Sequence, residues 1–344
     1  MTTIYLIRHA QCDGNLYRQY DGWYNTPLTP FGWQQAAALA ERFAPVHLDA
    51  IYASDLQRAM QTAQAIAEPK GLKVQPHRGL RETNMGIWEH MDWAQLRELW
   101  PGQAEVFADE PHNWKALGAE KLADVGQRVV SALWEIARQN DGRVVAVVSH
   151  GDVIQMALGL LRGRTLEELG KRKNYSTNTA VTKLEFDEND VNFVYEYDFS
   201  HLPKELVTSF INEQKWGMTY RILNFYEPFP VEEVQELPDR TEGVWIAGYM
   251  KGEPAALVQL KPTEYGRPGE IGFYYIVPRF RGLRLGIQPM GKVVDMLRAL
   301  GAPSVRICLE DEKMREYFEK RDDFHYIGDN VWERPIPPLA VVEP

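Results

Sequence analysis

Residues 4–10 have the sequence IYLIRHA, in which four apolar side chains run directly into an arginine and a histidine. A bounded apolar run of this length predicts a short buried strand. Arg8 and His9 do not suit a sheet interior, so the pair marks either a solvated strand end or a rigid position that presents chemistry at the strand tip. Ligands of an open parallel sheet gather at the carboxyl ends of its strands, which is where this pair would lie.

Strand and helix patterns alternate from this run to about residue 200. Apolar and β-branched runs predict strands at residues 4–7, 50–54, 72–77 and 144–150, and an antiparallel pair within residues 180–198. Apolar spacing and proline boundaries predict helices at residues 32–44, 56–69, 125–139 and 153–163. Alternating strands and helices joined by short connections indicate an α/β sandwich built on a mostly parallel sheet.

A different pattern occupies the rest of the chain. It predicts a strand hairpin about residues 251–253, strands at 270–277, 305–310, 324–328 and 331–335, and helices at 204–216, 287–300 and 311–321. We place the boundary near residues 199–206, which gives domains of residues 1–200 and 205–340. A chain of 344 residues also exceeds a typical single domain, so two domains are expected from the length alone.

The composition indicates a globular protein in a reducing compartment. The net charge is -10, so nucleic acid and membranes are not expected as partners, and an anionic substrate would need a local basic cluster. The two cysteines, Cys12 and Cys308, fall in different predicted domains, which argues against a disulfide framework. The N-terminal apolar run is too short for a signal peptide, and no stretch approaches the roughly 20 apolar residues of a membrane span. We therefore expect a cytoplasmic protein.

Three further segments carry polar side chains beside the predicted strands. AVVSHG ends a strand at His150, IYASDLQRAM places Arg58 near the start of a helix, and LRETNMG supplies Glu82 in a loop. The carboxyl ends of parallel strands meet at one edge of a sheet, so His9 and His150 are expected to lie together. A helix N-terminus near Arg58 would add partial positive charge. Together with Arg8, these residues predict a pocket.

The chain resembles the histidine phosphatase superfamily, in its phosphoglycerate mutase-like branch, through five segments in that family's order. They are RHAQCDGN, GWYNTPLTPFGWQQA, YASDLQRAMQTA, LRETNMGIWE and VVSHGDVI, and the likeness extends from residue 1 to about residue 195. The resemblance implies a three-layer α/β/α sandwich and a phosphohistidine mechanism that needs no metal or other cofactor. The histidine of the RH motif, here His9, would attack the phosphoryl group.

The residue types suit that chemistry. An imidazole has an unperturbed pKa of about 6.5, so His9 can act as a neutral nucleophile near pH 7 without a separate base. Arg8 and Arg58 offer planar forks of donors to phosphate oxygens, and His150 offers a further donor if it is protonated. Asn15 matches the family's asparagine after the RH motif and would add a neutral donor.

The resemblance makes Glu82 the proton donor to the leaving alkoxide and then the base that activates water. Glu82 must be protonated for the first step, so substrate binding is expected to raise its pKa. Ordinary structural roles are the alternatives. They are a strand-end residue for His9, capping or ion pairing for His150 and Arg58, and a turn cap for Asn15.

The chain departs from the family pattern directly after the RH pair. Ala10 stands where the family has glycine, and Cys12 is interpreted as a neutral filler. Specificity is expected to reside between Glu82 and Glu120, although core packing is the commoner role for the four tryptophans there, Trp88, Trp93, Trp100 and Trp114. Five histidines outside the motifs, at positions 47, 77, 90, 112 and 201, are expected on the surface or in structural roles.

Residues 271–297, IGFYYIVPRFRGLRLGIQPMGKVVDML, resemble the acetyl-CoA-binding segment of GNAT N-acetyltransferases. That segment is a strand, a loop of the form R-G-x-G-x-G, and a helix whose N-terminus meets a pyrophosphate. Arg281, Gly282 and Gly286 match the loop, whereas Arg284 occupies its central glycine position. The resemblance implies an α+β GNAT-like domain that binds acetyl-CoA, and whether it is catalytic stays open.

A tyrosine that protonates the leaving thiolate in the GNAT family aligns with Phe318, and Tyr317 is rotated from it by about 100° on a helix. A degenerate domain kept for binding or for a homodimer is therefore the alternative. For the whole chain we expect a metal-independent phosphomonoester hydrolase acting on a small phosphorylated metabolite. A phosphoglycerate mutase-type phosphotransferase, a bifunctional phosphatase and acetyltransferase, and a regulatory protein with a vestigial site are the alternatives.

Overall fold

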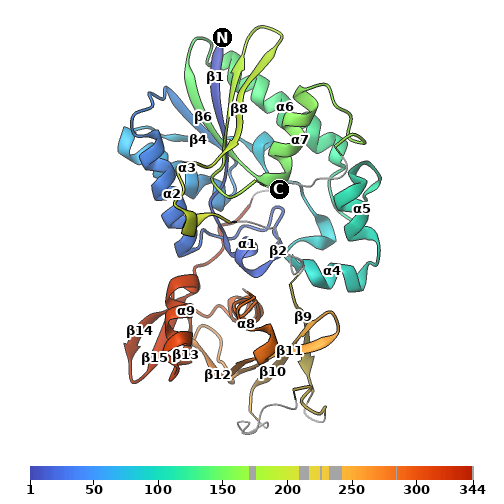
Figure 1. Cartoon of the computed structure of the whole chain (residues 1–344), viewed down its shortest axis with the longest axis vertical. Coiled ribbons are helices and arrows are strands. Elements are labelled where there is room, and N and C mark those ends of the chain that lie inside the picture. The colour runs from blue at the N-terminus through green and yellow to red at the C-terminus, as the bar shows by residue number, and fades with distance from the viewer. Residues whose placement is uncertain (170–175, 209–216, 225–226, 232–241, 284, 343–344) are drawn as a thin grey trace.

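The computed structural model describes residues 1–169, 176–208, 217–224, 227–231, 242–283 and 285–342 (Figure 1). The strands of the N-terminal part are β1 (Thr2–Arg8), β2 (Gln19–Tyr20), β3 (Ala50–Ala53), β4 (Val74–Pro76), β5 (Met91–Asp92), β6 (Val144–Ser149), β7 (Val181–Phe186) and β8 (Val191–Asp198). Its helices are α1 (Asp13–Tyr17), α2 (Pro30–Phe43), α3 (Gln57–Ala67), α4 (Trp93–Leu99), α5 (Gln103–Asp109), α6 (Leu122–Gln139) and α7 (Gly151–Leu161).

Six of these strands form one sheet in the order β4-β3-β6-β1-β7-β8. The pairs β1–β6, β3–β6 and β3–β4 are parallel, whereas β7 is antiparallel to both β1 and β8. The register places Arg8 of β1 opposite Ser149 of β6, so these two strands end together. The residues that follow them, His9 and His150, therefore reach the same edge of the sheet.

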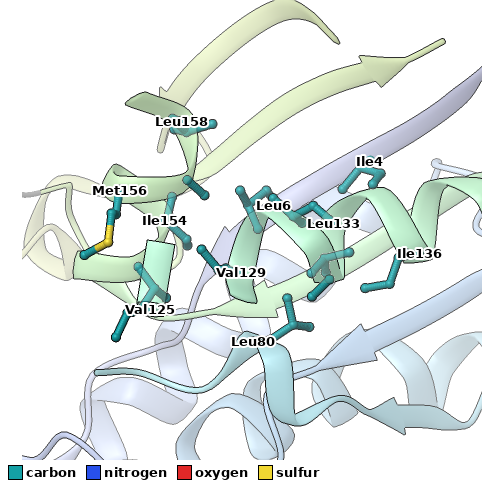
Figure 2. Close-up of a cluster of buried hydrophobic side chains, with 14 of the residues drawn as sticks. Ile4, Leu6, Leu80, Val125, Val129, Leu133, Ile136, Ile154, Met156 and Leu158 are labelled. Carbon is teal, nitrogen blue, oxygen red and sulfur yellow. The ribbon is translucent and has the colours of Figure 1, made fainter. Parts of the chain in front are cut away.

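Helices cover both faces of this sheet, which confirms the predicted three-layer α/β/α sandwich. On one face, α6 and α7 pack onto β1 and β6, and Figure 2 shows Leu133 of α6 beside Ile4 and Leu6 of β1. On the other face, α2 and α3 pack onto the sheet through a second apolar cluster that includes Leu39 and Ile66. The periodic apolar spacing of these helices is thus satisfied on both sides of a sheet that is buried in the middle.

The helices α4 and α5 lie where the sequence pattern predicted none. Between them and the sheet, aromatic side chains pack edge to face, with the rings of Trp88 and Trp114 5.3 Å apart and those of Phe107 and Trp114 4.9 Å apart. Trp88 and Trp114 are buried and Trp100 packs against their cluster, so three of the four tryptophans have the expected core role. The short amphipathic helices α4 and α5 carry too few apolar positions for their period to stand out in the sequence.

The C-terminal part is built on a mixed sheet. Its strands are β9 (Thr219–Leu223), β10 (Val244–Met250), β11 (Glu253–Leu260), β12 (Gly269–Ile276), β13 (Ser304–Cys308), β14 (His325–Gly328) and β15 (Val331–Pro335), and its helices are α8 (Gln288–Ala299) and α9 (Glu312–Asp322). The sheet order is β14-β15-β13-β12-β11-β10-β9, with β12 and β13 parallel and the other neighbours antiparallel. This is the α+β architecture expected of the second domain.

Most of one expected helix lies outside the residues that the structure describes. Residues 204–216 were predicted to be helical, but Lys204–Leu206 form a 3-10 turn and residues 209–216 lie outside the described residues. The boundary near residues 199–206 stays a prediction. Across the described ranges, no helix combines the length and the apolarity that crossing a bilayer requires.

The two parts of the chain share an apolar interface. Helix α8 lies against α1 as well as against its own sheet (Figure 1). Gly291 of α8 makes the approach close, because a Cβ there would lie 2.5 Å from Cγ of Tyr17. Tyr17 is buried within the apolar cluster of the C-terminal part, and its hydroxyl donates to Asp322 Oδ1 of α9 at 2.8 Å. The N-terminal part therefore contributes a side chain to the second core.

Buried charges also cross this interface. Asp13 at the start of α1 pairs with Arg298 Nη2 at 3.1 Å and with Arg334 Nη2 at 3.0 Å. Nε of Arg334 also lies 3.0 Å from Oδ1 of Asp322. Burial raises the pKa of Asp322 to about 7, against the lowering effect of the Arg334 charge. Charges taken out of water in this way require their partners, so the contact fixes one relative placement of the two parts.

Candidate active site

The ends of β1 and β6 bring two histidines together. The backbone N–H of His9 donates to the carbonyl of Ser149 at 2.9 Å, which extends the parallel pairing by one residue. The ring centroids of His9 and His150 lie 5.1 Å apart, and both side chains are buried. The proximity expected from the sheet is present, although 141 residues separate the two histidines in the chain.

The environment of His9 leaves it neutral, with one ring nitrogen set for attack. Its Nδ1 lies 2.7 Å from the carbonyl oxygen of Ala10, and only a protonated Nδ1 can donate to that acceptor. The other nitrogen, Nε2, then carries the lone pair. Burial lowers the pKa of His9 well below its ordinary value, and the charges of Arg58 and Arg8 lower it further. A neutral imidazole with a free Nε2 is the form that a nucleophile requires.

The buried Arg58 follows the first residue of α3, and carbonyl groups hold its guanidinium. Nη2 donates to the carbonyl of Gly22 at 2.7 Å, and Nη1 donates to that of Tyr24 at 3.0 Å. Arg8 is held in a similar way, since its Nη1 donates to the carbonyl of Ser176. Gly151 makes room for Arg8, because a Cβ at Gly151 would lie 3.1 Å from Nε of the arginine. Neutral carbonyl groups therefore help to orient both guanidinium groups.

His150 lies at the N-terminus of α7, where it is the capping residue. Neither ring nitrogen has a hydrogen-bond partner within the described residues, although the side chain is fully buried. Burial lowers the pKa of His150 well below its ordinary value, and the charge of Arg58 lowers it further. His150 was expected to donate if protonated, whereas these surroundings keep its imidazole neutral in the free site. A bound dianion would reverse the electrostatic balance and favour the protonated form.

Glu82 has the perturbed pKa of a proton donor. Its Oε1 accepts from the backbone N–H of Thr83 at 2.9 Å, and its Oε2 accepts from that of Asp152 at 3.4 Å. Burial raises the pKa of Glu82 from 4.5 to about 7, and the negative charge of Asp152 adds to the rise. Substrate binding was expected to raise the pKa of Glu82, but the fold already raises it before any substrate binds.

Asn15 is tied to the backbone of the RH loop. Its Oδ1 accepts from the backbone N–H of Cys12 at 3.4 Å and from Nδ2 of Asn178 at 3.0 Å, and Asn178 Nδ2 also donates to the carbonyl of His9. Asn15 therefore fills the turn-capping role held open for it, and these bonds do not use its amide nitrogen Nδ2. Burial raises the pKa of the Cys12 thiol to about 12, as suits a neutral filler.

Sequence reasoning missed three residues that support Glu82. The indole N–H of Trp23 donates to the carbonyl of Glu82 at 2.8 Å, and Nη2 of Arg128 donates to the same oxygen at 2.8 Å. Asp152, two residues after His150, supplies the charge that raises the pKa of Glu82. Trp23 and Asp152 lie inside the motif segments quoted above, so their position in the sequence could have indicated a place near the site. Arg128 lies in the middle of α6, and nothing in the sequence around it indicated such a place.

In the C-terminal part, the loop between β12 and α8 contains the expected anion-site residues. Gly282 has a φ of +74°, a backbone conformation that L side chains rarely adopt, which explains a glycine there. Nε of Arg281 donates to the carbonyl of Ile276 at 2.8 Å. The carbonyl of Gly286 accepts from the hydroxyl of Tyr274 at 2.7 Å. The fourth predicted residue, Arg284, lies outside the described residues.

The aromatic pair on α9 is arranged differently from the family alignment. Phe318 is buried in the core, with its ring 5.3 Å from that of Tyr274. Tyr317 faces the loop instead, because a Cβ added at Gly286 would lie 3.5 Å from its hydroxyl oxygen. Phe318, which the sequence aligns with the family's tyrosine, therefore lies in the core, and the hydroxyl near the loop belongs to Tyr317. No group of three or more His, Cys, Asp or Glu side chains within the described ranges is arranged to hold a metal ion.

A buried neutral imidazole near two arginines, at the edge where parallel strands end, is an arrangement suited to phosphoryl transfer. Residues 4–198 match the family model for the histidine phosphatase superfamily (branch 1), more than half of the chain, and the protein belongs to that superfamily. Residues 215–324 match the acetyltransferase (GNAT) family. The predicted fusion of these two domain types is confirmed.

The N-terminal part is similar in sequence to several named proteins. Phosphoserine phosphatase 1 of Hydrogenobacter thermophilus is 35% identical over 150 residues, which are 44% of this chain and 71% of that protein. A probable phosphoglycerate mutase GpmB of Salmonella paratyphi A is 28% identical over 189 residues, 55% of this chain and 87% of that one. The alternative phosphotransferase function therefore also has a named relative.

Solved structures agree with the fold. Bacillus stearothermophilus YhfR is 32% identical with a TM-score of 0.56, and the match covers 58% of this chain and 99% of that one. Mycobacterial glucosyl-3-phosphoglycerate phosphatase, solved with vanadate, is 27% identical with a TM-score of 0.52, covering 57% and 98%. Phosphoserine phosphatase of Entamoeba histolytica is 26% identical with a TM-score of 0.52, covering 59% and 100%.

Proposed function

We propose that the N-terminal domain hydrolyses phosphomonoesters of small metabolites through a phosphohistidine formed on His9. The observation that carries this proposal is the state of His9, a buried neutral imidazole whose Nδ1 is committed to the carbonyl of Ala10. In this state Nε2 can attack phosphorus without first losing a proton. Arg8 and Arg58 are the partners proposed for the phosphate oxygens, with His150 and Asn15 as further donors.

The first half-reaction transfers the phosphoryl group to the protein. The lone pair on Nε2 of His9 forms the P–N bond while the bond between phosphorus and the ester oxygen breaks. The leaving alkoxide takes the proton of Glu82, which is partly protonated near neutral pH because burial and Asp152 raise its pKa to about 7. The first half-reaction thus ends with the alcohol released, a phosphohistidine and a Glu82 carboxylate.

The second half-reaction restores the site. The Glu82 carboxylate takes a proton from water, and the oxygen of that water attacks phosphorus as the P–N bond breaks. Inorganic phosphate leaves, His9 regains its lone pair and Glu82 is protonated again. Charge on the equatorial oxygens is met by Arg8 and Arg58, which carbonyl groups already orient, so little reorganisation is needed during the reaction.

We favour hydrolysis over mutase-type transfer to a second substrate. The named relatives include phosphatases of phosphoserine and glucosyl-3-phosphoglycerate, which supports a small phosphorylated metabolite with a carboxylate as the substrate class. Release of inorganic phosphate in proportion to substrate consumed, with no transfer to an added acceptor alcohol, would support the phosphatase. Transfer to 3-phosphoglycerate would establish the mutase instead.

The direct test uses an aryl phosphate and the variant His9→Asn. Wild-type protein is expected to release phosphate with EDTA present, and His9→Asn should lose at least about 10³-fold of that activity because the nucleophile is gone. His47→Asn is the matched control, since His47 is exposed and bonded only to its neighbour Asp49 in the described contacts. Trapping with ³²P-labelled substrate should give an acid-labile adduct in the wild type. Full activity in His9→Asn would refute the mechanism.

For the C-terminal domain we propose binding of acetyl-CoA at the loop between β12 and α8. Three observations support this proposal. Gly282 has a positive φ, the carbonyl of Gly286 accepts a hydrogen bond from Tyr274, and α8 begins directly after this loop. Acetyl-CoA is expected to raise the melting temperature, and Gly286→Val should remove that rise while leaving the ligand-free melting temperature almost unchanged. No rise with the wild type would count against the proposal. The homodimer, the absence of nucleic-acid and membrane partners, and the cytoplasmic location stay predictions.

A further inference from the structure

We propose that the C-terminal domain positions the phosphate-binding Arg58 of the N-terminal site, through His90 held between Asp295 of α8 and Asp21. This inference rests on the proposed phosphatase function and adds positioning residues from the second domain to it. The three side chains form a continuous chain of contacts across the interface between α8 and the N-terminal part.

The first link is the turn that orients Arg58. Among the described residues, Nη1 and Nη2 of its guanidinium donate to carbonyl groups of one short segment, those of Tyr24 and Gly22. Any movement of that turn would displace the two acceptors together. The direction of the Arg58 fork is therefore set by the backbone of residues 21–24 and not by a carboxylate partner.

The second link ties this turn to His90. The imidazole of His90 stacks on the ring of Tyr24, with centroids 3.7 Å apart and an angle of 17° between the planes. Its Nδ1 lies 3.3 Å from Oδ1 of Asp21, which begins the turn. Oδ2 of the same Asp21 accepts from the hydroxyl of Thr26 just beyond the turn. His90 thus contacts the turn at Asp21, its first residue, and at Tyr24, whose carbonyl accepts a hydrogen bond from Arg58.

The third link crosses to the second domain. Nε2 of His90 lies 2.7 Å from Oδ1 of Asp295, and Oδ2 of Asp295 accepts from Nε2 of Gln19 at 2.8 Å. Asp295 lies in the middle of α8, the helix that packs against α1, and Arg298 one turn later lies 3.7 Å from its Oδ1. Both carboxylate oxygens of Asp295, which belongs to the second domain, therefore contact side chains of the N-terminal part.

The charges around His90 favour the bridging form of its ring. Asp21 and Asp295 raise the pKa of His90 to about 9 although burial acts in the opposite direction. Near neutral pH the ring is therefore an imidazolium, in which both nitrogens donate and both carboxylates accept. Charge-assisted hydrogen bonds in a buried setting hold geometry more tightly than neutral ones. His90 also has a φ of +59°, a backbone conformation uncommon for a side-chain-bearing residue, so its placement is specified by these contacts.

The test measures how Asp295 and Arg58 cooperate in binding vanadate. In the full-length protein, Asp295→Asn is expected to weaken vanadate binding about tenfold, equivalent to about 1.4 kcal/mol, because the turn that orients Arg58 loses its anchor. Lys292→Gln is the matched control: it removes another ion pair from α8, to Asp92 at 3.2 Å, and should change binding less than twofold. Titration by Trp fluorescence gives the dissociation constants, and melting temperatures show that each variant is folded.

The decisive comparison repeats Asp295→Asn in proteins whose Arg58 is already altered. With Arg58→Gln, or with Arg58→Lys if the first variant does not fold, Asp295→Asn should change vanadate affinity less than twofold, because the guanidinium fork through which it acts is absent. An equal loss in both backgrounds, or no loss in either, would overturn the positioning role. If the wild type binds vanadate and hydrolyses phosphomonoesters while Asp295→Asn matches it, only this inference fails. If the wild type does neither, the proposed function fails and this inference with it.

Discussion

Replacing Asp152 by asparagine should move the alkaline limb of the pH–rate profile to lower pH. Burial and the charge of Asp152 together raise the pKa of Glu82 from 4.5 to about 7. The protonated carboxyl is the acid that the leaving group needs, so kcat/KM of the wild type should fall as the pH rises through about 7. Asparagine removes the charge but keeps the backbone N–H that donates to Oε2 of Glu82. The pKa of Glu82 should therefore drop, and the pH at which kcat/KM falls should drop with it.

The size of the effect follows from the two causes of the shift. A rise from 4.5 to about 7 corresponds to about 3 kcal/mol against the ionised carboxylate. Burial is the larger cause and the Asp152 charge the second. If Asp152 accounts for about 1.4 kcal/mol, the limb of the variant lies near pH ~6, and its kcat/KM at pH ~8 is about tenfold below that of the wild type. Below pH ~5 the two proteins should agree.

The assay must use an alkyl phosphate, with release of inorganic phosphate followed over the pH range. A nitrophenolate departs without a proton, so with a nitrophenyl ester the same variant should show little change, which separates loss of the acid from loss of binding. Asp124→Asn is the matched control, because Asp124 also lies in a helix first turn but is exposed on α6. Glu82→Gln should abolish the limb altogether. A limb that stays in place in Asp152→Asn, or that moves to higher pH, would refute the reasoning.

Three further predictions concern the interface and the thiols. Tyr17→Ala should lower the free energy of unfolding by about 3–5 kcal/mol and Tyr17→Phe by about 1–3 kcal/mol, measured by denaturant titration, because the first leaves a cavity and the second removes only a hydrogen bond. Gly291→Ala should cost about 1–3 kcal/mol, since its Cβ would lie 2.5 Å from Cγ of Tyr17, whereas Gly286→Ala should be tolerated; equal melting temperatures would contradict this. Native protein should release one equivalent of thionitrobenzoate from DTNB, because only the exposed Cys308 should react. Cys12 should not react, since it is buried and burial raises its pKa to about 12. Release of two equivalents without denaturant would be the contrary result.

The elements around the site could be predicted because their signals are local. The apolar runs ahead of His9 and His150 specify buried strands, and parallel pairing then brings the two strand ends together whatever the separation in sequence. Arg58 follows for the same reason, since α3 starts directly after a strand end. Patterns of this kind depend on the period of one element and the topology of one sheet.

The parts that could not be predicted depend on contacts between distant elements. His90 was expected to be a surface or structural residue, and it is structural, but nothing in its neighbourhood reveals Asp295 as its partner. The exchange of Phe318 and Tyr317 has a similar origin, because the rotation of α9 on its sheet decides which ring is buried, and the sequence alignment does not contain that rotation. Glu82 was identified by resemblance, whereas its raised pKa depends first on burial and second on the charge of Asp152, and folding alone supplies both.

The Asp13 and Tyr17 contacts bear on how this chain can be inherited and recombined. Both residues lie within nine positions of His9, and both are completed by groups from the C-terminal domain. A gene fragment encoding only residues 1–200 would leave the Asp13 carboxylate without its two arginines and would expose the apolar Tyr17 ring to water. The two domains therefore cannot be exchanged freely with those of related proteins. A substitution that adapts α8 to a new role must also be compatible with the loop that carries the nucleophile, so the two halves are expected to evolve as one unit.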